Sequence, residues 1–334
     1  MITTDLNPLL QARSPARRLS IVIPIYNEEE TIPFLRRAID SFCETLLIPV
    51  EIVLVDDGSK DKSLCLLAEW AQQDPRILVV ALARNFGHQA AATAGLDHAS
   101  GDAIVLIDAD LQDPLEVIHE MLQKFLEGYD VVYGQRKSRA GETRFKLATA
   151  WIFYRILQFL GYPELPSDTG DFRLISRRCL DALKELREQD RFLRGLVTWV
   201  GFMQTSVLYE RKARVAGKTK YPFKEMVRFA SDGIFSFSIM PLRVSFLFGS
   251  VVSGLGILYG AIGIVRYFIW GDTVRGWTSL IVITGLGMGT ILFSVGILGE
   301  YIGRIYAEVK RRPLYVIASS FSRQGISMVR TQNR

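Results

Sequence analysis

Short apolar runs recur along the first part of the chain, and most of them end in polar residues. They are Leu19–Ile23, Glu51–Val55, Ile77–Leu82, Ala103–Ile107 and Val131–Gly134. Runs of this length that are rich in valine, isoleucine and leucine predict buried β-strands. Apolar residues spaced three and four apart predict helices over Thr31–Leu47 and Ser63–Gln73. Because strands and helices alternate, the pattern indicates an α/β domain with a parallel, doubly wound sheet.

Polar side chains follow three of these strands directly. The three clusters are Pro24–Glu28, Asp56–Ser59 and Asp108–Asp110. In doubly wound sheets, ligands bind beyond the carboxyl ends of the strands. The clusters therefore predict one shared site rather than three separate ones.

Asp108 and Asp110 are the most informative of these residues. Side chains two apart along a strand emerge on one face, where two carboxylates can share a hard divalent cation with the phosphates of a ligand. A solvated pair in a loop is the simpler alternative for an isolated Asp-x-Asp. The acidic end of the second strand and the following Leu111–Pro114 segment favour a site that binds a nucleotide diphosphate.

The composition changes after Arg243. Neither Val244–Val265 nor Gly276–Gly299 contains a charged residue, and about 20 apolar residues suffice to cross roughly 30 Å of hydrocarbon. The short segment between them predicts a transmembrane hairpin over residues 243–304, with helices at 244–270 and 276–303. The glycine pairs Gly256/Gly260 and Gly285/Gly289 have the spacing of helix contacts and favour a homo-oligomer, although glycine is common in membrane helices generally.

The basic residues around the hairpin predict its orientation. They precede and follow it at Arg243, Arg304, Lys310, Arg311 and Arg312, against Arg266 and Arg275 near the connector. Cytoplasmic loops carry the excess of Lys and Arg. We therefore expect an integral membrane protein whose first domain and both termini lie in the cytoplasm.

Overall composition adds three exclusions. The net charge of +5 and the pI of about 9.1 are mild, and we expect no nucleic-acid partner. The three cysteines, Cys43, Cys65 and Cys179, have no metal-binding spacing, and their odd, scattered placement favours a reducing compartment. Residues 1–18 lack an apolar core of signal-peptide length and are interpreted as a flexible lead.

Two aromatic, amphipathic stretches have the character of interfacial helices. Phe145–Leu160 mixes aromatic residues with Lys146 and Arg155, and Phe223–Phe237 directly precedes the hairpin. An ordinary helix covering the sheet is an equal alternative for the first stretch. The organisation expected is a lead (1–18), an α/β domain (19–221), an interfacial helix (222–242), the hairpin (243–304) and a cytoplasmic tail (305–334).

Six motifs in order give the chain a family resemblance. They are IVIPIYNEE, VDDGS, RNFGHQAA, DADLQDP, GDFRL and RVAGKTKYPF. Together they resemble the family-2 glycosyltransferases with a GT-A fold. More narrowly, they resemble the polyprenyl-phosphate glycosyltransferases, which include dolichol-phosphate mannose synthases and bactoprenol glucosyltransferases. The match covers about residues 18–315, and the hairpin favours the bactoprenol type. This resemblance implies that residues 19–221 are the GT-A catalytic domain and that the protein lies in the bacterial inner membrane with that domain in the cytoplasm.

The resemblance implies a set of residues that bind the nucleotide sugar. The set is Pro24, Tyr26, Asn27, Glu28, Asp56, Asp57, Arg84, Gly87 and Gln112. Capping of the next helix is an alternative role for Asp57 and Ser59. His88 is interpreted as a neighbouring polar residue rather than a general base, because three histidines in the chain form no triad or metal set.

The resemblance also implies the catalytic and acceptor residues. Asp108 and Asp110 are expected to bind Mg²⁺ or Mn²⁺, and Asp171 to orient a substrate in preference to acting as a base. The residues expected to bind the acceptor phosphate are Arg136, Arg144, Arg214, Lys218 and Lys220. Arg211 and Lys212 belong to the same basic group, with attraction to anionic lipid headgroups as their alternative role.

The implied reaction is inverting transfer of a hexose to a polyprenyl (undecaprenyl) phosphate. UDP-glucose is the favoured donor; GDP-mannose, a UDP-N-acetylhexosamine and a UDP-aminoarabinose derivative are alternatives. A nucleotide-regulated flippase or channel is an alternative of another class, but two spans without internal ionisable residues offer no polar path. A nucleotidyltransferase would share Asp-x-Asp but not the GDFRL and AGKTKY segments.

Overall fold

The computed structural model describes residue 13 and residues 16–137, 169–212, 240–271, 276–323 and 325–327. The chain divides into two compact units. The first comprises residues 1–158, 163–222 and 313–334, and the second comprises residues 159–162 and 223–312. Several predictions lie outside the described residues. They concern the stretches 145–160 and 223–237 and the residues Arg144, Arg214, Lys218 and Lys220.

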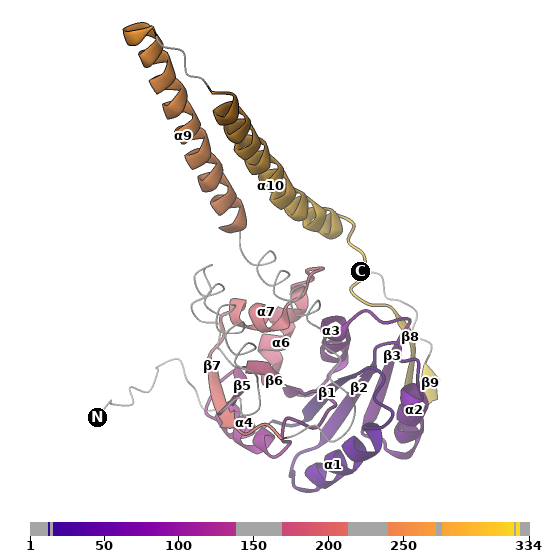
Figure 1. The fold of residues 1–334 in the computed structure, drawn as a ribbon. Helices are drawn as coiled ribbons and strands as arrows, with labels where there is room; N and C mark the ends of the chain where they lie inside the picture. The colour runs from indigo at the N-terminus through magenta and orange to yellow at the C-terminus, as the bar shows by residue number, and fades with distance from the viewer. Residues whose placement is uncertain are drawn as a thin grey trace, which may run out of the picture. The chain divides into compact units, whose positions relative to one another are not determined.

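The first unit is built on the predicted alternation of strands and helices (Figure 1). Its first strands are β1 (Leu19–Ile25), β2 (Val50–Asp56), β3 (Ile77–Leu82) and β4 (Ala103–Leu106). Its first helices are α1 (Ile32–Glu44), α2 (Ser63–Gln73), α3 (His88–His98) and α4 (Val117–Leu126). The four strands pair in parallel in the order β3-β2-β1-β4. This arrangement confirms the α/β fold class and aligns the carboxyl ends of the strands.

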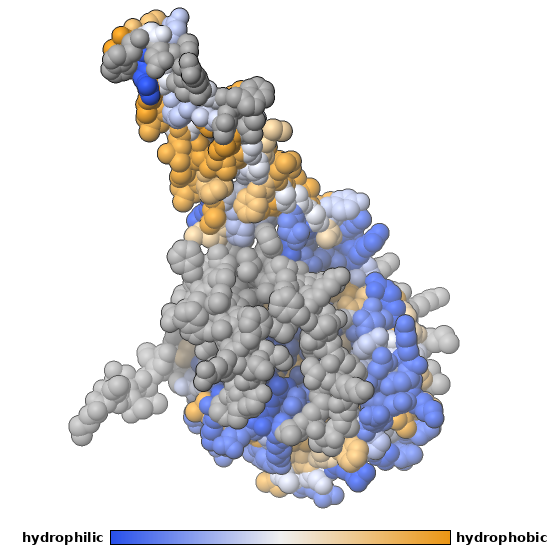
Figure 2. Space-filling model, viewed as in Figure 1, coloured by the Kyte–Doolittle hydropathy of each residue, from blue (hydrophilic) through white to orange (hydrophobic). Residues whose placement is uncertain are grey.

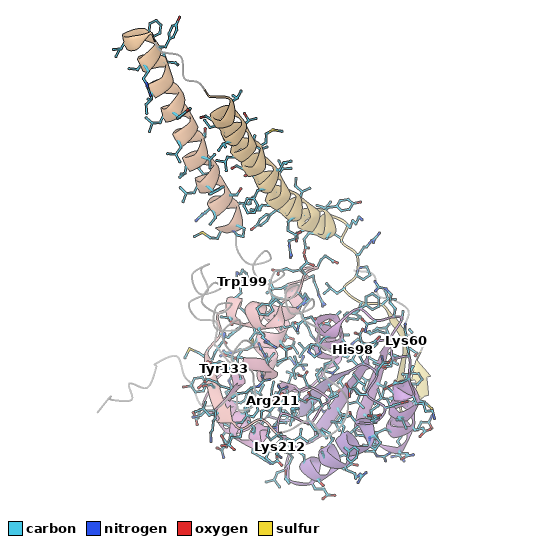
Figure 3. All side chains as sticks on the ribbon, viewed as in Figure 1. Lys60, His98, Tyr133, Trp199, Arg211 and Lys212 are labelled. Carbon is cyan, nitrogen blue, oxygen red and sulfur yellow. The ribbon has the colours of Figure 1, made fainter. Side chains whose placement is uncertain are left out.

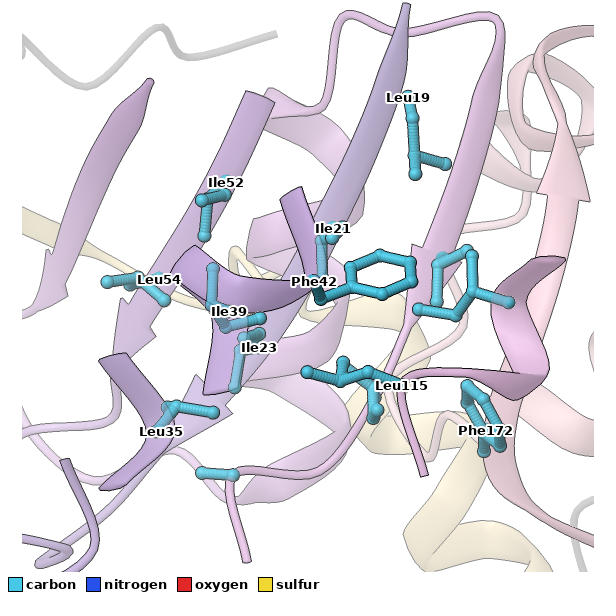
Figure 4. Close-up of a cluster of buried hydrophobic side chains, with 14 of the residues drawn as sticks. Leu19, Ile21, Ile23, Leu35, Ile39, Phe42, Ile52, Leu54, Leu115 and Phe172 are labelled. Atoms are coloured by element: carbon cyan, nitrogen blue, oxygen red, sulfur yellow. The ribbon is translucent and has the colours of Figure 1, made fainter. Parts of the chain in front are cut away.

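Alternating side chains of the central strands build the core. Leu19, Ile21 and Ile23 of β1 are fully buried in one cluster with residues of α1 such as Leu35 and Ile39 (Figure 4). Residues of α2 and α4 join the same cluster, whereas α3 packs against β1 and β2 from outside it. Since side chains alternate across a strand, helices on both faces require strands that are apolar on both faces.

The sheet is not wholly parallel. Beyond β4 it continues through β6 (Thr169–Ser176), β5 (Val131–Arg136) and β7 (Gln204–Tyr209), and β6 runs antiparallel to both of its neighbours. The helices α6 (Arg177–Glu185) and α7 (Leu193–Trp199) follow β6. Because an antiparallel strand begins where its neighbour ends, the start of β6 lies beside the carboxyl end of β4. The reversal therefore brings the GDFRL motif beside the polar residues at the carboxyl ends of the parallel strands.

Both ends of the chain contribute to this unit. The strand β8 (Ile317–Ser322) pairs antiparallel with β3, and β9 (Gly325–Ser327) pairs with β8. Both strands lie within the segment expected to be a cytoplasmic tail, and the three serines of β8 gave no strong strand signal. Within the expected lead, Arg13 forms an ion pair of 2.6 Å with Asp130, and Ala16 is buried in the core.

The second unit contains the predicted hairpin. Its helices are α9 (Met240–Trp270) and α10 (Trp277–Val309), both long and apolar enough to cross a membrane. Apolar side chains dominate their surface, whereas hydrophilic residues dominate the visible described surface of the first unit (Figure 2). The Oγ atoms of Ser245 and Ser294 are 2.7 Å apart and join the two helices.

The glycine pairs expected to mediate helix contacts lie away from this contact. A β-carbon at Gly256, Gly260, Gly285 or Gly289 would meet no atom within 4 Å. Within the described hairpin these glycines are therefore not contact positions. Association with further copies stays a prediction.

Candidate active site

Two carboxylates, one from β6 and one from the turn after β4, meet at one histidine. His88 begins α3, and its Nε2 lies 3.2 Å from Oδ2 of Asp171 and 3.6 Å from Oδ1 of Asp108. The Nε atom of Arg194, in α7, lies 2.8 Å from Oδ1 of Asp171. Gln89 adds a hydrogen bond of 3.3 Å to Oδ2 of Asp171. The Asp171 carboxylate is thus held on both oxygens, and the motifs RNFGHQAA, DADLQDP and GDFRL form one cluster.

The charges in this cluster shift one another's pKa values. Burial lowers the pKa of the His88 imidazole, but the hydrogen bond to Asp171 and the two carboxylate charges outweigh burial and raise it to about 9. Burial raises the pKa of Asp108 to about 6. Burial alone would also raise the pKa of Asp171. The charge of Arg194 and the contact with His88 outweigh burial and hold this pKa well below the ordinary value. At neutral pH, His88 is therefore protonated and Asp171 ionised.

The Asp108–Asp110 pair lies in a turn and not on a strand. Since β4 ends at Leu106, the alternation used to place both side chains on one face does not apply. Leu111 has a φ of 55°, in the left-handed region, and the Gln112 N–H donates to Oδ1 of Asp110 at 3.1 Å. The turn directs Asp108 toward His88 and Asp110 toward the segment after β7.

That segment carries Arg211 to the second aspartate. Its Nη2 lies 3.9 Å from Oδ2 of Asp110, and its Nε lies 3.9 Å from Oδ1 of Asp113. The backbone of the next residue, Lys212, donates to the Gln112 carbonyl at 2.9 Å. Arg211 and Lys212 are labelled in Figure 3. Arg211 therefore contacts site carboxylates, whereas lipid attraction alone would require no such contact.

Arg136, at the end of β5, lies beside the GDFRL motif. Its Nε is 3.5 Å from the hydroxyl of Tyr209, and a β-carbon on Gly170 would lie only 3.1 Å from its Nη2. Gly170 directly precedes Asp171. The structure thus brings the expected acceptor-phosphate residue Arg136 next to the expected catalytic residue.

The residues expected to bind the nucleotide gather at the ends of β1 and β2. The backbone N–H of Asn27 donates to Oγ of Ser59 at 2.9 Å, and the N–H of Lys60 donates to Oδ1 of Asn27 at 2.8 Å. The neighbouring Asp56 is buried, and its Oδ1 has no hydrogen-bond partner among the residues that the structure describes. A buried acceptor without a partner costs free energy, which a donor group on a bound ligand would recover.

Asp57 supports the next loop. Its two oxygens accept the backbone N–H groups of Phe86 and Gly87 at 2.7 and 3.0 Å. Since the N-cap position of α2 is Lys62, which lies beyond both residues in the chain, the alternative that Asp57 and Ser59 cap this helix is wrong. Arg84 stacks over the Phe86 ring at 4.0 Å and donates a hydrogen bond of 2.9 Å to the Asn85 carbonyl, and these contacts hold it within its own loop.

Three residues of the site carried no signal in the sequence analysis. Arg194 lies in α7 without a recognised motif, Tyr209 ends an ordinary strand, and Asp113 is a neighbour of the more obvious Asp110. Each has its role through partners distant in the chain. A charge within an apolar segment, as in Phe192-Leu193-Arg194-Gly195-Leu196, is the one available clue, because a charge that is partly removed from water needs a partner.

The carboxylates fit a divalent metal that is shared with a ligand. Among the described residues, no group of three or more His, Cys, Asp and Glu side chains is arranged to hold a metal alone. Mg²⁺ in nucleotide sites typically takes one or two protein carboxylates and completes its shell with phosphate oxygens and water. The side chains of Asp108 and Asp110 keep 34% and 10% of their surface exposed, so both remain accessible to such an ion.

The chain is similar to known glycosyltransferases over nearly its whole length. Residues 20–184 match the family described as Glycosyl transferase family 2. The chain is 48% identical over 318 residues to the uncharacterized glycosyltransferase YkcC of Bacillus subtilis, covering 94% of this chain and 97% of that protein. It is 43% identical over 304 residues to the SfII prophage-derived bactoprenol glucosyl transferase of Shigella flexneri, covering 91% and 98%.

Among solved structures, glucosyl-3-phosphoglycerate synthase from Mycobacterium tuberculosis is similar at 22% identity and a TM-score of 0.49. The similarity covers 66% of this chain and 76% of that one. The sequence relatives carry the assignment, because they are 43% to 48% identical over more than nine tenths of the chain. The chain belongs to glycosyltransferase family 2.

Proposed function

We propose that the protein transfers glucose from UDP-glucose to a polyprenyl phosphate at the cytoplasmic face of the membrane. The observation that carries this proposal is the joining of Asp108, His88 and Asp171 in one cluster, with Arg136 beside it. The relative of Shigella flexneri, named a bactoprenol glucosyl transferase, supports the choice of sugar and lipid.

In the proposed reaction, an oxygen of the acceptor phosphate attacks the anomeric carbon of the sugar. The bond from that carbon to the nucleoside diphosphate breaks, its electron pair leaves with the diphosphate, and the configuration inverts. The acceptor oxygen is already anionic near neutral pH. A residue that removes a proton is therefore not required.

Asp171 suits orientation better than proton transfer. Its carboxylate contacts Arg194 and His88 on opposite oxygens, and its pKa is well below the ordinary value. A general base is most effective when its pKa lies near the working pH. We assign to Asp171 the positioning of His88 and of a substrate group at the start of β6.

Mg²⁺ or Mn²⁺, held by Asp108 and Asp110, would neutralise charge on the departing diphosphate when bound. Asp56, Asn27 and the β1–β2 strand ends would hold the nucleoside. Arg136 and the basic segment that starts at Arg211 would bind phosphate, since a guanidinium can grip it through two parallel hydrogen bonds.

The sheet constrains the membrane topology of this proposal. The chain leaves the first unit after β7 and returns to it at β8, which pairs with β3 of the same sheet. If α9 and α10 both span the membrane, the segments on either side of the hairpin lie on one face of it. The connector of residues 272–275 then lies on the other face.

The full chain in mild detergent tests the activity when it is incubated separately with radiolabelled UDP-glucose, GDP-mannose, UDP-N-acetylglucosamine and a UDP-aminoarabinose derivative. Undecaprenyl phosphate is the acceptor. We expect a labelled lipid product chiefly from UDP-glucose. A product from another donor alone would overturn the sugar assignment, and no lipid product from any donor would overturn the reaction.

Arg136→Ala tests the acceptor assignment. We expect the KM for polyprenyl phosphate to rise roughly tenfold to a hundredfold, which corresponds to about 1.5 to 3 kcal/mol for one charged contact. The KM for the nucleotide sugar should change little. A variant that weakens only the nucleotide sugar would assign this arginine to the donor diphosphate instead.

A further inference from the structure

The hydroxyl of Tyr209 lies between an arginine and an aspartate of the site. It donates a hydrogen bond to Oδ1 of Asp113, and Nε of Arg136 approaches it at 3.5 Å. Tyr209 and Asp113 are 3% and 2% exposed. A buried polar pair of this kind needs its partners, so the hydroxyl fixes the geometry of both neighbours.

The backbone explains why these residues meet. In the parallel pairing of β5 and β7, Arg136 stands opposite Tyr209, and both strands end there at the edge where the site lies. The Tyr209 ring also packs edge-on against Phe172 of the GDFRL motif, with centroids 5.7 Å apart and an interplanar angle of 89°. Gly134 permits this packing, because a β-carbon there would lie 2.8 Å from both rings.

Asp113 connects Tyr209 to the turn that contains Asp108 and Asp110. Its Oδ1, which accepts from Tyr209, also lies 3.9 Å from Nε of Arg211, whose Nη2 is 3.9 Å from Asp110. Tyr209 and Arg211 are separated by a single residue. A continuous series of contacts therefore runs from Arg136 through Tyr209 and Asp113 to Arg211 and Asp110.

We propose that Tyr209 and Asp113 are positioning residues that hold Arg136 in place to bind the acceptor phosphate, Tyr209 by contacting its Nε and Asp113 by fixing the Tyr209 hydroxyl. The interaction with Arg136 uses Nε, not the terminal pair Nη1 and Nη2, through which a guanidinium can bind phosphate. Without the hydroxyl, Arg136 gains rotamers that point away from the phosphate. Fixing a flexible side chain in its binding geometry improves affinity by reducing the entropy lost on binding.

This inference rests on the proposed function, and Tyr209→Phe tests it. The substitution keeps the ring and its packing on Phe172 but removes the hydroxyl. We expect the KM for undecaprenyl phosphate to rise about tenfold, with the KM for UDP-glucose changed less than about twofold. The direct Kd for undecaprenyl phosphate, measured without nucleotide sugar, should rise in parallel.

Tyr133→Phe is the matched control. Tyr133 lies on β5, is labelled in Figure 3 and forms a hydroxyl hydrogen bond with Ser206 on β7. It contacts none of the site residues in the described structure. Its variant removes a hydroxyl from the same pair of strands and should leave both KM values and the lipid Kd unchanged, although its Tm falls slightly.

A double variant distinguishes positioning from general destabilisation. In an Arg136→Ala background, Tyr209→Phe should add less than about twofold to the KM for the lipid, because residues acting through one another are not additive. Multiplicative effects in the double variant, or equal effects of Tyr209→Phe and Tyr133→Phe, would overturn the inference.

The two hypotheses fail in different ways. Absence of lipid-linked glucose with the unmodified chain contradicts the proposed function. A normal lipid Kd for Tyr209→Phe contradicts the positioning role, whether or not transfer occurs.

Discussion

The hydroxyl of Tyr315 donates a hydrogen bond of 2.7 Å to Oδ2 of Asp97, near the end of α3. The same carboxylate forms an ion pair of 2.7 Å with Arg187, which follows α6. Tyr315 lies two residues before β8, and α3 begins with His88 of the site. The chain segment after α10 is therefore attached both to the sheet edge and to the helix that supplies a site residue.

This attachment predicts that Tyr315→Phe destabilises the catalytic unit. Loss of a hydrogen bond to a carboxylate should cost about 1.5 to 3 kcal/mol, which lowers the Tm by several degrees. The unfolding of the purified chain, followed by tryptophan fluorescence, measures the change. Tyr306→Phe, at an exposed position of α10, is the control, and an equal Tm for the two variants would contradict the role of the tail.

Asp110→Asn should abolish transfer while the protein stays folded, because the amide cannot supply the anionic oxygen that a hard cation prefers. EDTA should inactivate the unmodified enzyme, and Mg²⁺ or Mn²⁺ should restore it. Asp108→Asn should also be severe. Radiolabelled lipid product measures activity, with the exposed Asp181→Asn on α6 as the control variant. Full activity in chelator would refute the metal assignment.

The environment of His88 predicts a pH dependence of stability. Its pKa of about 9 in the folded protein exceeds the value near 6.5 in the unfolded chain. Its contribution to folding stability is therefore fully present below pH 6.5 and disappears as pH rises through 9. His88→Asn should lower the Tm at pH 6, and the deficit should shrink toward pH 9.5. Thermal unfolding in EDTA excludes metal effects. A deficit that is constant over this range would contradict the prediction.

Among the described carboxylates outside the site, Asp130 should contribute most to the folding stability of the protein. It is fully buried, pairs with Arg13 and Arg178, and accepts a hydrogen bond of 2.6 Å from Ser176. Burial raises its pKa, but these partners outweigh burial and lower it. Its contribution to stability is therefore present above the ordinary carboxyl pKa and lost as pH falls through the lowered value.

Asp130→Asn should cost about 3 kcal/mol, at the low end of the range for breaking a buried pair, because both arginines reach solvent. Denaturant unfolding at pH 7 measures this loss. Asp181→Asn removes an exposed partner of Arg177 at 3.7 Å and should cost less than about 1 kcal/mol. Similar losses for the two variants would show that burial of Asp130 has no special effect.

The expected membrane topology predicts that the connector between α9 and α10 is accessible to reagents from outside the cell. A cysteine placed at Asp272 should react with a membrane-impermeant maleimide added outside the cytoplasmic membrane, in a background where Cys65, the exposed native cysteine, is replaced by Ser. A cysteine at Lys212, in the catalytic unit, should react only after the membrane is opened. Labelling of the cysteine at position 272 from the cytoplasmic side alone would show that the topology is the reverse of the one expected.

The sequence by itself determined the elements whose signal is local. The apolar runs that became β1 to β5 are short, rich in β-branched residues and followed by polar groups, and the helical spacing of α1 and α2 is equally direct. The length of the charge-free segments likewise predicted α9 and α10. These properties depend on each segment's own solvation and periodicity, so no distant partner is needed to recognise them.

Tertiary structure decided which segments meet. The reversal of β6 places Asp171 beside the end of β4, and Arg194 and His88 then contact it from two helices. The strand β8 joins β3 although the hairpin separates them in the chain. Such contacts leave little local trace, because ion pairs and strand edges gain their free energy only when a partner far along the chain is brought within a few ångströms.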